Sequence, residues 1–226
     1  MNRRAFLSGI ALAGIPAAEA QRGLLLPSDE PDEFGFRLMW YNPVPALDLH
    51  SYHLRIGGLV EKQQSLSLEE LRHLPQETQN CRLKCVQCWS SRAAWGGFRF
   101  AHLVELAKPK AAAHAFRLDC ADKWYEYFTL VEILSPRVLL ALDMAGKPLT
   151  ASHGAPLRVI DPARYGYKSA KLITAITFVE QGKGSMACDI GPYYTPGGEI
   201  QAGYDHPLDL GAGVRRKITG GEITGY

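Results

Sequence analysis

The sequence predicts an α+β fold with one main domain, because predicted strands and short helices follow one another without a regular repeat. Its 226 residues are 46% hydrophobic and 21% charged, which excludes a disordered, collagen-like or coiled-coil chain. The 22 Gly and 14 Pro residues favour many turns and short elements over long helices. The formal net charge is only +2, so we expect no nucleic acid as a partner.

Residues 1–20 predict an export signal that is not part of the fold. Arg3 and Arg4 form a twin-arginine pair, an apolar run covers residues 10–18, and Ala18-Glu19-Ala20 has the small residues of a cleavage site. The apolar run is shorter than the roughly 20 residues that a membrane-spanning helix needs. We therefore expect a twin-arginine signal peptide cleaved after Ala20, and a protein that is periplasmic or otherwise exported.

The mature chain divides into an arm and a domain. Residues 21–35 are acidic, contain Pro and show no hydrophobic period, which is typical of a linker or a surface arm. The domain is expected over residues 36–226. After Glu180 the chain becomes rich in Gly, Pro and Tyr and loses periodicity, so this tail is expected to wrap the surface.

Alternation and capping signals place the elements of the domain. A strand over residues 52–56 ends at Gly57-Gly58. A capping box, Ser67 with Glu70, predicts a short helix that stops before Pro75, and Thr129 with Glu132 predicts another. Apolar residues at helical spacing predict a helix over residues 100–107. Further strands are predicted over residues 115–119, 125–128, 138–142, 156–160 and 172–179.

Three cysteines, Cys81, Cys85 and Cys88, lie within eight residues. A structural zinc site needs four ligands, usually as two pairs, and only Cys120 and Cys188 remain elsewhere. The C-x₃-C-x₂-C spacing equals that of radical enzymes with an iron–sulfur cluster, but their repeated βα units are missing here. Two interpretations of the three cysteines stay open. They are buried small hydrophobic residues, or one of them is a thiolate that binds a metal otherwise held by an organic cofactor.

Several sequence blocks occur in the order typical of one enzyme family. The blocks are Asn42–Asp48, Arg82-Leu83-Lys84-Cys85-Val86, Trp89-Ser90, Trp95-Gly96-Gly97-Phe98, His153–Ile160 and Tyr165–Lys171. Together they resemble the sulfite oxidase family of molybdenum enzymes, and within it the bacterial branch that includes the catalytic subunit of the periplasmic protein-methionine-sulfoxide reductase. The likeness runs from about residue 38 to residue 180.

This resemblance implies a mixed-sheet, molybdopterin-binding domain and a molybdenum-molybdopterin cofactor. In it Cys85 supplies the one protein thiolate on molybdenum, whereas Cys81 and Cys88 are packing residues or neighbours of the site. The sulfite-oxidising branch adds a C-terminal sandwich domain for dimerisation. Because nothing follows Tyr226 in this sequence, we expect that domain to be absent and the protein to be a monomer.

The resemblance also assigns the remaining site residues. Arg92 and Tyr194, with Tyr193 as the alternative to Tyr194, are the further catalytic candidates. Two departures bear on the substrate. Where the sulfite-oxidising branch has Asn-Arg-Arg this sequence has one Arg only, so Arg92 or Arg164 would have to bind the anion, and Gln87 stands where the reductase branch has Glu. The residues implied to contact the cofactor are Asn42, Cys120, His153, Arg158, Ser169, Ala170 and Lys171.

The reaction that the resemblance implies is oxygen-atom transfer on a sulfur or nitrogen oxo-compound, such as the reduction of a small sulfoxide or of methionine sulfoxide in proteins. The sequence has no C-x-x-C-H haem motif, so electrons are expected to pass through a separate carrier, a cytochrome or a membrane redox partner. Sulfite dehydrogenation is the alternative reaction. A non-catalytic metal-binding or cofactor-binding module is the alternative of another class.

Overall fold

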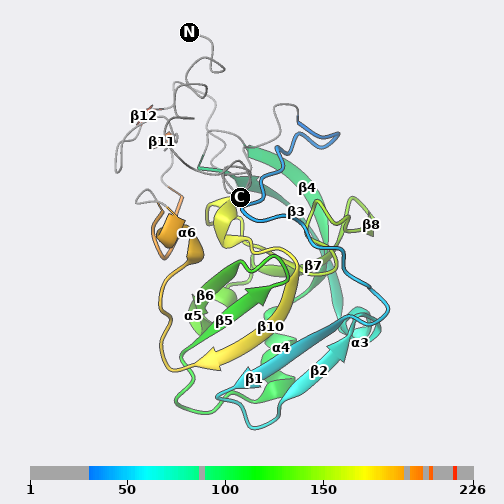
Figure 1. The fold of residues 1–226 in the computed structure, drawn as a ribbon, viewed down its shortest axis with the longest axis vertical. Helices are drawn as coiled ribbons and strands as arrows, with labels where there is room; N and C mark the ends of the chain where they lie inside the picture. The colour runs from blue at the N-terminus through cyan, green and yellow to red at the C-terminus, as the bar shows by residue number, and fades with distance from the viewer. Residues whose placement is uncertain (1–30, 87–89, 191–193, 201–203, 206–215, 218–226) are drawn as a thin grey trace, which may run out of the picture.

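The computed structural model describes residues 31–86, 90–190, 194–200, 204–205 and 216–217 (Figure 1). The expected signal peptide, Cys88 and Tyr193 lie outside the described residues. Two five-stranded sheets and a few short helices form the domain, which confirms the predicted α+β class. No helix in the described ranges is long and apolar enough to cross a membrane.

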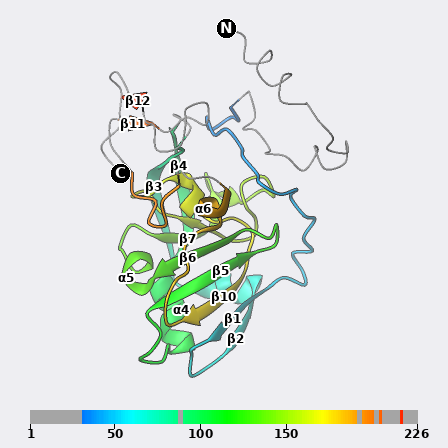
Figure 2. The same ribbon diagram turned by 60° about the vertical axis from the view of Figure 1, so that its left-hand side comes forward.

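The first sheet joins strands from both ends of the domain. Its only parallel pair is β1 with β10, where Arg55 lies opposite Ala175, and all its other pairs are antiparallel. Figure 2 shows these strands running side by side. The order across the sheet is β2 (Gln64–Ser67), β1 (His53–Gly58), β10 (Ile173–Val179), β5 (Ala115–Cys120) and β6 (Tyr125–Thr129).

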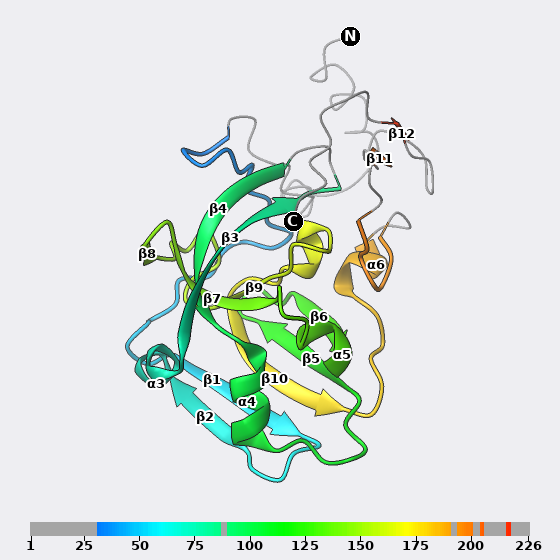
Figure 3. The ribbon, with the colours of Figure 1, turned by 180° about the vertical axis from the view of Figure 1, so that it is seen from behind.

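The second sheet is built on a long hairpin of β3 and β4, which curve together in Figure 3. At Gly97 the register of β4 against β7 shifts, and an added Cβ would overlap the Leu140 carbonyl and lie 2.7 Å from Cα of Ala141. Only glycine fits there. The strands are β3 (Gln76–Lys84), β4 (Ser90–Phe98), β7 (Leu139–Met144), β8 (Lys147–Pro148) and β9 (Arg158–Ile160), which pairs with β7.

The helices begin where the capping signals predict. Ser67 caps α3 (Leu68–His73) and Thr129 caps α5 (Leu130–Ile133), each through a complete capping box. The helix α4 spans Phe100–Ala107 as predicted. The described tail is more structured than expected, because it contains α6 (Met186–Ile190) and the paired strands β11 (Tyr204–Asp205) and β12 (Arg216–Lys217).

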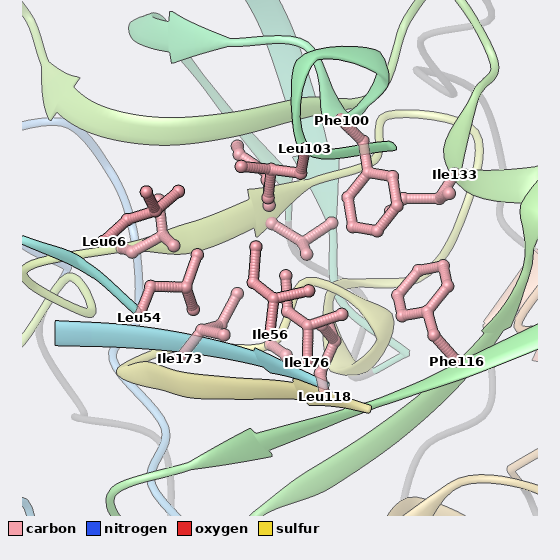
Figure 4. Close-up of a cluster of buried hydrophobic side chains, with 14 of the residues drawn as sticks. Leu54, Ile56, Leu66, Phe100, Leu103, Phe116, Leu118, Ile133, Ile173 and Ile176 are labelled. Carbon is pink, nitrogen blue, oxygen red and sulfur yellow. The ribbon is translucent and has the colours of Figure 1, made fainter. Parts of the chain in front are cut away.

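The main hydrophobic core lies between the first sheet, α4 and the second sheet, as Figure 4 shows. Its centre is a row of rings in which Phe116 stacks on Phe100 at 4.5 Å and on Phe128 at 5.8 Å between centroids. Leu54 from β1 and Ile176 from β10 extend the core along the sheet. This core holds the sheets in place, and the site lies beyond it, where loops from the two sheets meet.

Candidate cofactor site

One cavity brings together segments that are far apart in the sequence. Its empty volume is about 1150 Å³, part of which is open to solvent. The walls come from residues 36–41, the end of β3, the turn after β5, and the segments 152–158 and 166–171. Seven of the predicted site residues line it: Cys85, His153, Arg158, Ser169, Ala170, Lys171 and Tyr194.

Cys85 reaches the cavity because β3 ends just before it. The backbone of Lys84 pairs with that of Tyr165, which brings the end of β3 beside the loop that follows β9. Cys85 is half-buried and forms no disulfide. Cys81 is fully buried in a second core cluster, where the Gln79 side-chain amide donates to its sulfur at 3.3 Å. Burial raises the pKa of Cys81, so this thiol is a poor metal ligand and a packing residue.

Arg158 is buried against the cavity with an unused donor. Its Nη1 donates to the carbonyl of His153 at 2.8 Å, and the guanidinium lies 5.1 Å from the ring centre of Trp95. Burial lowers the pKa of Arg158 to about 10, so the side chain stays cationic at neutral pH. Its Nε is buried and has no hydrogen-bond partner among the described residues.

Lys171 contacts the segment that precedes β1. Its Nζ donates to the carbonyl of Met39 at 2.7 Å and lies 3.5 Å from the ring centre of Trp40. Burial, and then the charge of Arg158, lower the pKa of Lys171 to about 7. A bound anion would favour the ammonium form, so this side chain is suited to a phosphate.

His153 contacts a residue from the segment expected to be a linker. That segment is described from Pro31 onward, and Asp32 there places Oδ2 2.9 Å from Nε2 of His153. The rings of Phe34 and Phe36 meet the imidazole edge-on at 6.3 and 6.1 Å. Residues 31–36 are therefore packed against the cavity wall.

Three predicted residues lie outside the cavity wall. Arg92 is exposed on β4, and Asn42 is half-buried just beyond the lining residue Tyr41. Cys120 is buried in the main core at the end of β5, and burial raises its pKa well above the usual value. Neither Arg92 nor Cys120 is therefore among the described residues that line this cavity.

The hydrogen-bond donors facing the cavity differ from those the resemblance implied. The N–H groups of Ser169 and Ala170 both donate to protein carbonyls at 3.0 Å. Among the described side chains that line the cavity, the buried donors without an acceptor are instead Nε of Arg158 and the indole nitrogens of Trp40 and Trp124. Buried donors without partners are costly, and all three side chains line the cavity. They fit a polar, anionic group such as a pterin phosphate.

Some lining residues could not be chosen from the sequence. Asp122 is only 6% exposed, and burial raises its pKa while the backbone N–H of Trp124 donates to its Oδ1 at 3.1 Å. Tyr167 donates to the Thr195 carbonyl at 2.8 Å, and its ring lies 4.9 Å from that of Tyr194. In the sequence, only the short stretch Asp122–Trp124 between two predicted strands indicated this part of the cavity wall.

A buried ion pair anchors the segment that carries Tyr194. Nζ of Lys168 lies 2.5 Å from a carboxylate oxygen of Glu126, and both side chains are at most 1% exposed. The same ammonium donates to the carbonyls of Tyr127 at 2.8 Å and Pro196 at 2.9 Å. Lys168 therefore joins β6 to residues 194–198.

Among the described residues, no three His, Cys, Asp or Glu side chains are grouped so that they could hold a metal ion. The zinc interpretation therefore has no ligand set in those ranges. A metal held by a single protein thiolate, with an organic cofactor supplying the other ligands, needs no such group.

Comparisons with known proteins agree with this arrangement. Residues 41–187 match the family described as the oxidoreductase molybdopterin binding domain. The catalytic subunit MsrP of protein-methionine-sulfoxide reductase from Xanthomonas axonopodis pv. citri is 34% identical over 180 residues, which cover 72% of this chain and 56% of that protein. The subunit of the same name from Campylobacter jejuni is 32% identical over 148 residues, covering 58% and 50%.

Among solved structures, the sulfane dehydrogenase SoxCD from Paracoccus pantotrophus matches with a TM-score of 0.58 and 19% identity, over 74% of this chain and 54% of that one. This likeness supports the fold alone. The chain spans about half the length of the curated relatives it matches. Since the family match covers most of the domain and the fold agrees, the chain belongs to the molybdopterin-binding oxidoreductases of the sulfite oxidase family.

Proposed function

We propose that this chain is an exported molybdenum-molybdopterin enzyme that reduces sulfoxides, including methionine sulfoxide in proteins. Electrons arrive from a separate carrier, a cytochrome or a membrane redox partner. The observation that carries the proposal is the single cavity that joins the Cys85 thiol to the cations of Arg158 and Lys171. The relatives named as protein-methionine-sulfoxide reductase subunits support the substrate class.

In this proposal each part of the cavity has a distinct task. Cys85 holds the metal, because a soft thiolate is a suitable donor to it. Lys171 and Arg158 hold the phosphate, and the indole N–H groups of Trp40 and Trp124 donate to the polar edge of the cofactor. When bound, the cofactor supplies two-electron oxygen-atom transfer, while the protein binds and orients the reactants.

The substrate side of the cavity favours a neutral sulfoxide over sulfite. Met39 and Tyr41 give this wall an apolar and aromatic character. Arg92, the candidate for an anion clamp, is exposed on β4 and does not line the cavity. We assign the hydroxyl of Tyr194 as the hydrogen-bond donor to the substrate oxygen. Arg92 therefore offers no clamp for the sulfite dianion in this cavity.

The proposal is tested by metal analysis of freshly isolated, mature protein, because molybdenum, iron and zinc separate the main interpretations. We expect stoichiometric molybdenum, and reduction of methionine sulfoxide when a reduced dye supplies electrons. Iron or zinc in place of molybdenum would overturn the metal assignment. Bound molybdenum without sulfoxide reduction would leave sulfite dehydrogenation or a non-catalytic module.

A matched pair of cysteine variants tests the ligand. Cys85→Ser should lose all activity while keeping its thermal unfolding midpoint near that of the wild type, because only one ligand of the metal is changed. Cys81→Ser changes a thiol buried in the second core cluster, so it should lose some stability but retain molybdenum and activity. Activity retained at the wild-type level in Cys85→Ser would refute the assignment of Cys85 as the ligand.

A further inference from the structure

The N-terminal segment reaches into the cavity wall through one acidic side chain. Asp32 forms a tight turn, in which Oδ1 accepts the backbone N–H groups of Phe34 at 2.9 Å and Phe36 at 2.8 Å. This turn fixes the direction of the carboxylate, so that Oδ2 lies 2.9 Å from Nε2 of His153. The two side chains are only 18% and 10% exposed.

The imidazole of His153 has little freedom to turn. Its backbone carbonyl accepts from Arg158 at 2.8 Å, and its backbone N–H donates to the carbonyl of Thr150 at 3.0 Å. The rings of Phe34 and Phe36 pack against the imidazole edge. His153 lines the cavity, whereas Asp32 stands behind it and does not.

These contacts determine which nitrogen of the ring carries the proton. Burial and the nearby charge of Arg158 lower the pKa of His153, so the neutral imidazole prevails at neutral pH. A neutral imidazole has one N–H, and a carboxylate can only accept. Because Oδ2 of Asp32 lies 2.9 Å from Nε2, we expect the proton on Nε2, which leaves Nδ1 as an acceptor.

We infer that Asp32 is a positioning residue that holds His153 in the Nε2–H form, so that its Nδ1 accepts a hydrogen bond from an N–H group of the bound pterin. A pterin carries such donors in its amino group and ring N–H groups. Carboxylate–histidine pairs of this kind fix the tautomer of a ligand-binding imidazole in many metal sites. The inference rests on the proposed function only in that a pterin cofactor occupies this cavity.

Asp32→Asn is the most informative variant. The Asn side chain keeps an oxygen to accept from Phe34 and Phe36, so the turn is preserved. Its NH₂ group then donates toward Nε2 of His153, which must accept, and the proton moves to Nδ1. Glu33→Gln is the matched control, because Glu33 is the adjacent carboxylate and is exposed.

The tautomer is read by ¹⁵N NMR of the imidazole nitrogens in the full chain prepared without cofactor, with His153 assigned from the loss of its signals in His153→Asn. We expect the Nε2–H form in the wild type and in Glu33→Gln, and the Nδ1–H form in Asp32→Asn. A doubly protonated ring, an Nδ1–H wild type, or an unchanged ring in Asp32→Asn would each overturn the inference. This measurement does not involve the cofactor, so its outcome is separate from that of the proposed function.

The second measurement is the pterin retained by each purified variant, released and oxidised to its fluorescent form. Asp32→Asn should retain about tenfold less pterin than the wild type and Glu33→Gln. In the His153→Asn background, where an amide offers both a donor and an acceptor, the same change at residue 32 should have no effect. An equal loss in both backgrounds would show that Asp32 acts by supporting the fold and not through His153.

Discussion

Replacing Lys168 with Met should destabilise the protein strongly, because it leaves the buried carboxylate of Glu126 without its cation. Both side chains are at most 1% exposed, and Lys168 also satisfies the carbonyls of Tyr127 and Pro196. Breaking a buried pair on one side costs about 3–5 kcal/mol. At about 2–4 °C per kcal/mol for a domain of this size, the unfolding midpoint should fall by roughly 6–20 °C.

The pH dependence separates this cause from a simple loss of packing. Burial raises the pKa of Glu126 to about 7, so its neutral form favours the folded state at low pH, and that contribution is lost as the pH rises through about 7. Without Lys168 the pKa rises further, so Lys168→Met should be destabilised less at about pH 5 than at about pH 8.

The assay is thermal unfolding followed by circular dichroism at both pH values, with Lys183→Met as the exposed control, which should change stability by less than about 0.5 kcal/mol. A midpoint for Lys168→Met within about 2 °C of the wild type, or an equal loss at both pH values, would refute the reasoning.

Two further perturbations follow from the geometry. Gly97→Ala should destabilise the fold by more than about 3 kcal/mol, because the added Cβ would overlap the Leu140 carbonyl. Gly57→Ala, whose added Cβ has nothing within 4 Å, should fold normally. Equal expression levels and unfolding midpoints for the two variants would contradict this reasoning. In the cofactor-free chain, the affinity for inorganic phosphate, measured by calorimetry, should fall between about pH 7 and pH 9 as Lys171 loses its proton through a pKa of about 7, and Lys171→Gln should bind weakly with no such slope. An unchanged slope in Lys171→Gln would place the phosphate elsewhere.

Local signals were sufficient for the helices but not for the second sheet. Two capping boxes and an apolar period placed the helices α3, α4 and α5, because these signals depend on residues three or four positions apart. The strand β3 is polar along its first half, and β4 contains Gly96, Gly97 and several small residues, so neither shows a strand pattern of its own. Their pairing with each other and with β7 supplies the stability that the local sequence lacks.

The cavity too combines residues that sequence blocks identify with contacts that only the fold brings together. Cys85, Arg158 and Lys171 were found because their blocks resemble a known family, and the structure brings them to one cavity. The contact between Asp32 and His153 joins residues 121 positions apart, and an acidic segment with Pro is typical of an exposed linker. Nothing in the spacing of the sequence connects these two side chains, so only the folded chain could show them together.

The walls of the cavity also constrain when the protein can acquire its cofactor. One wall begins at Phe36, and another ends at Tyr194. The central strand of the first sheet, β10, is the last of that sheet to be synthesised, yet it pairs with β1, the first. The cavity is therefore complete only when the chain up to Tyr194 is present and β1 has paired with β10, so cofactor binding depends on nearly the whole described domain.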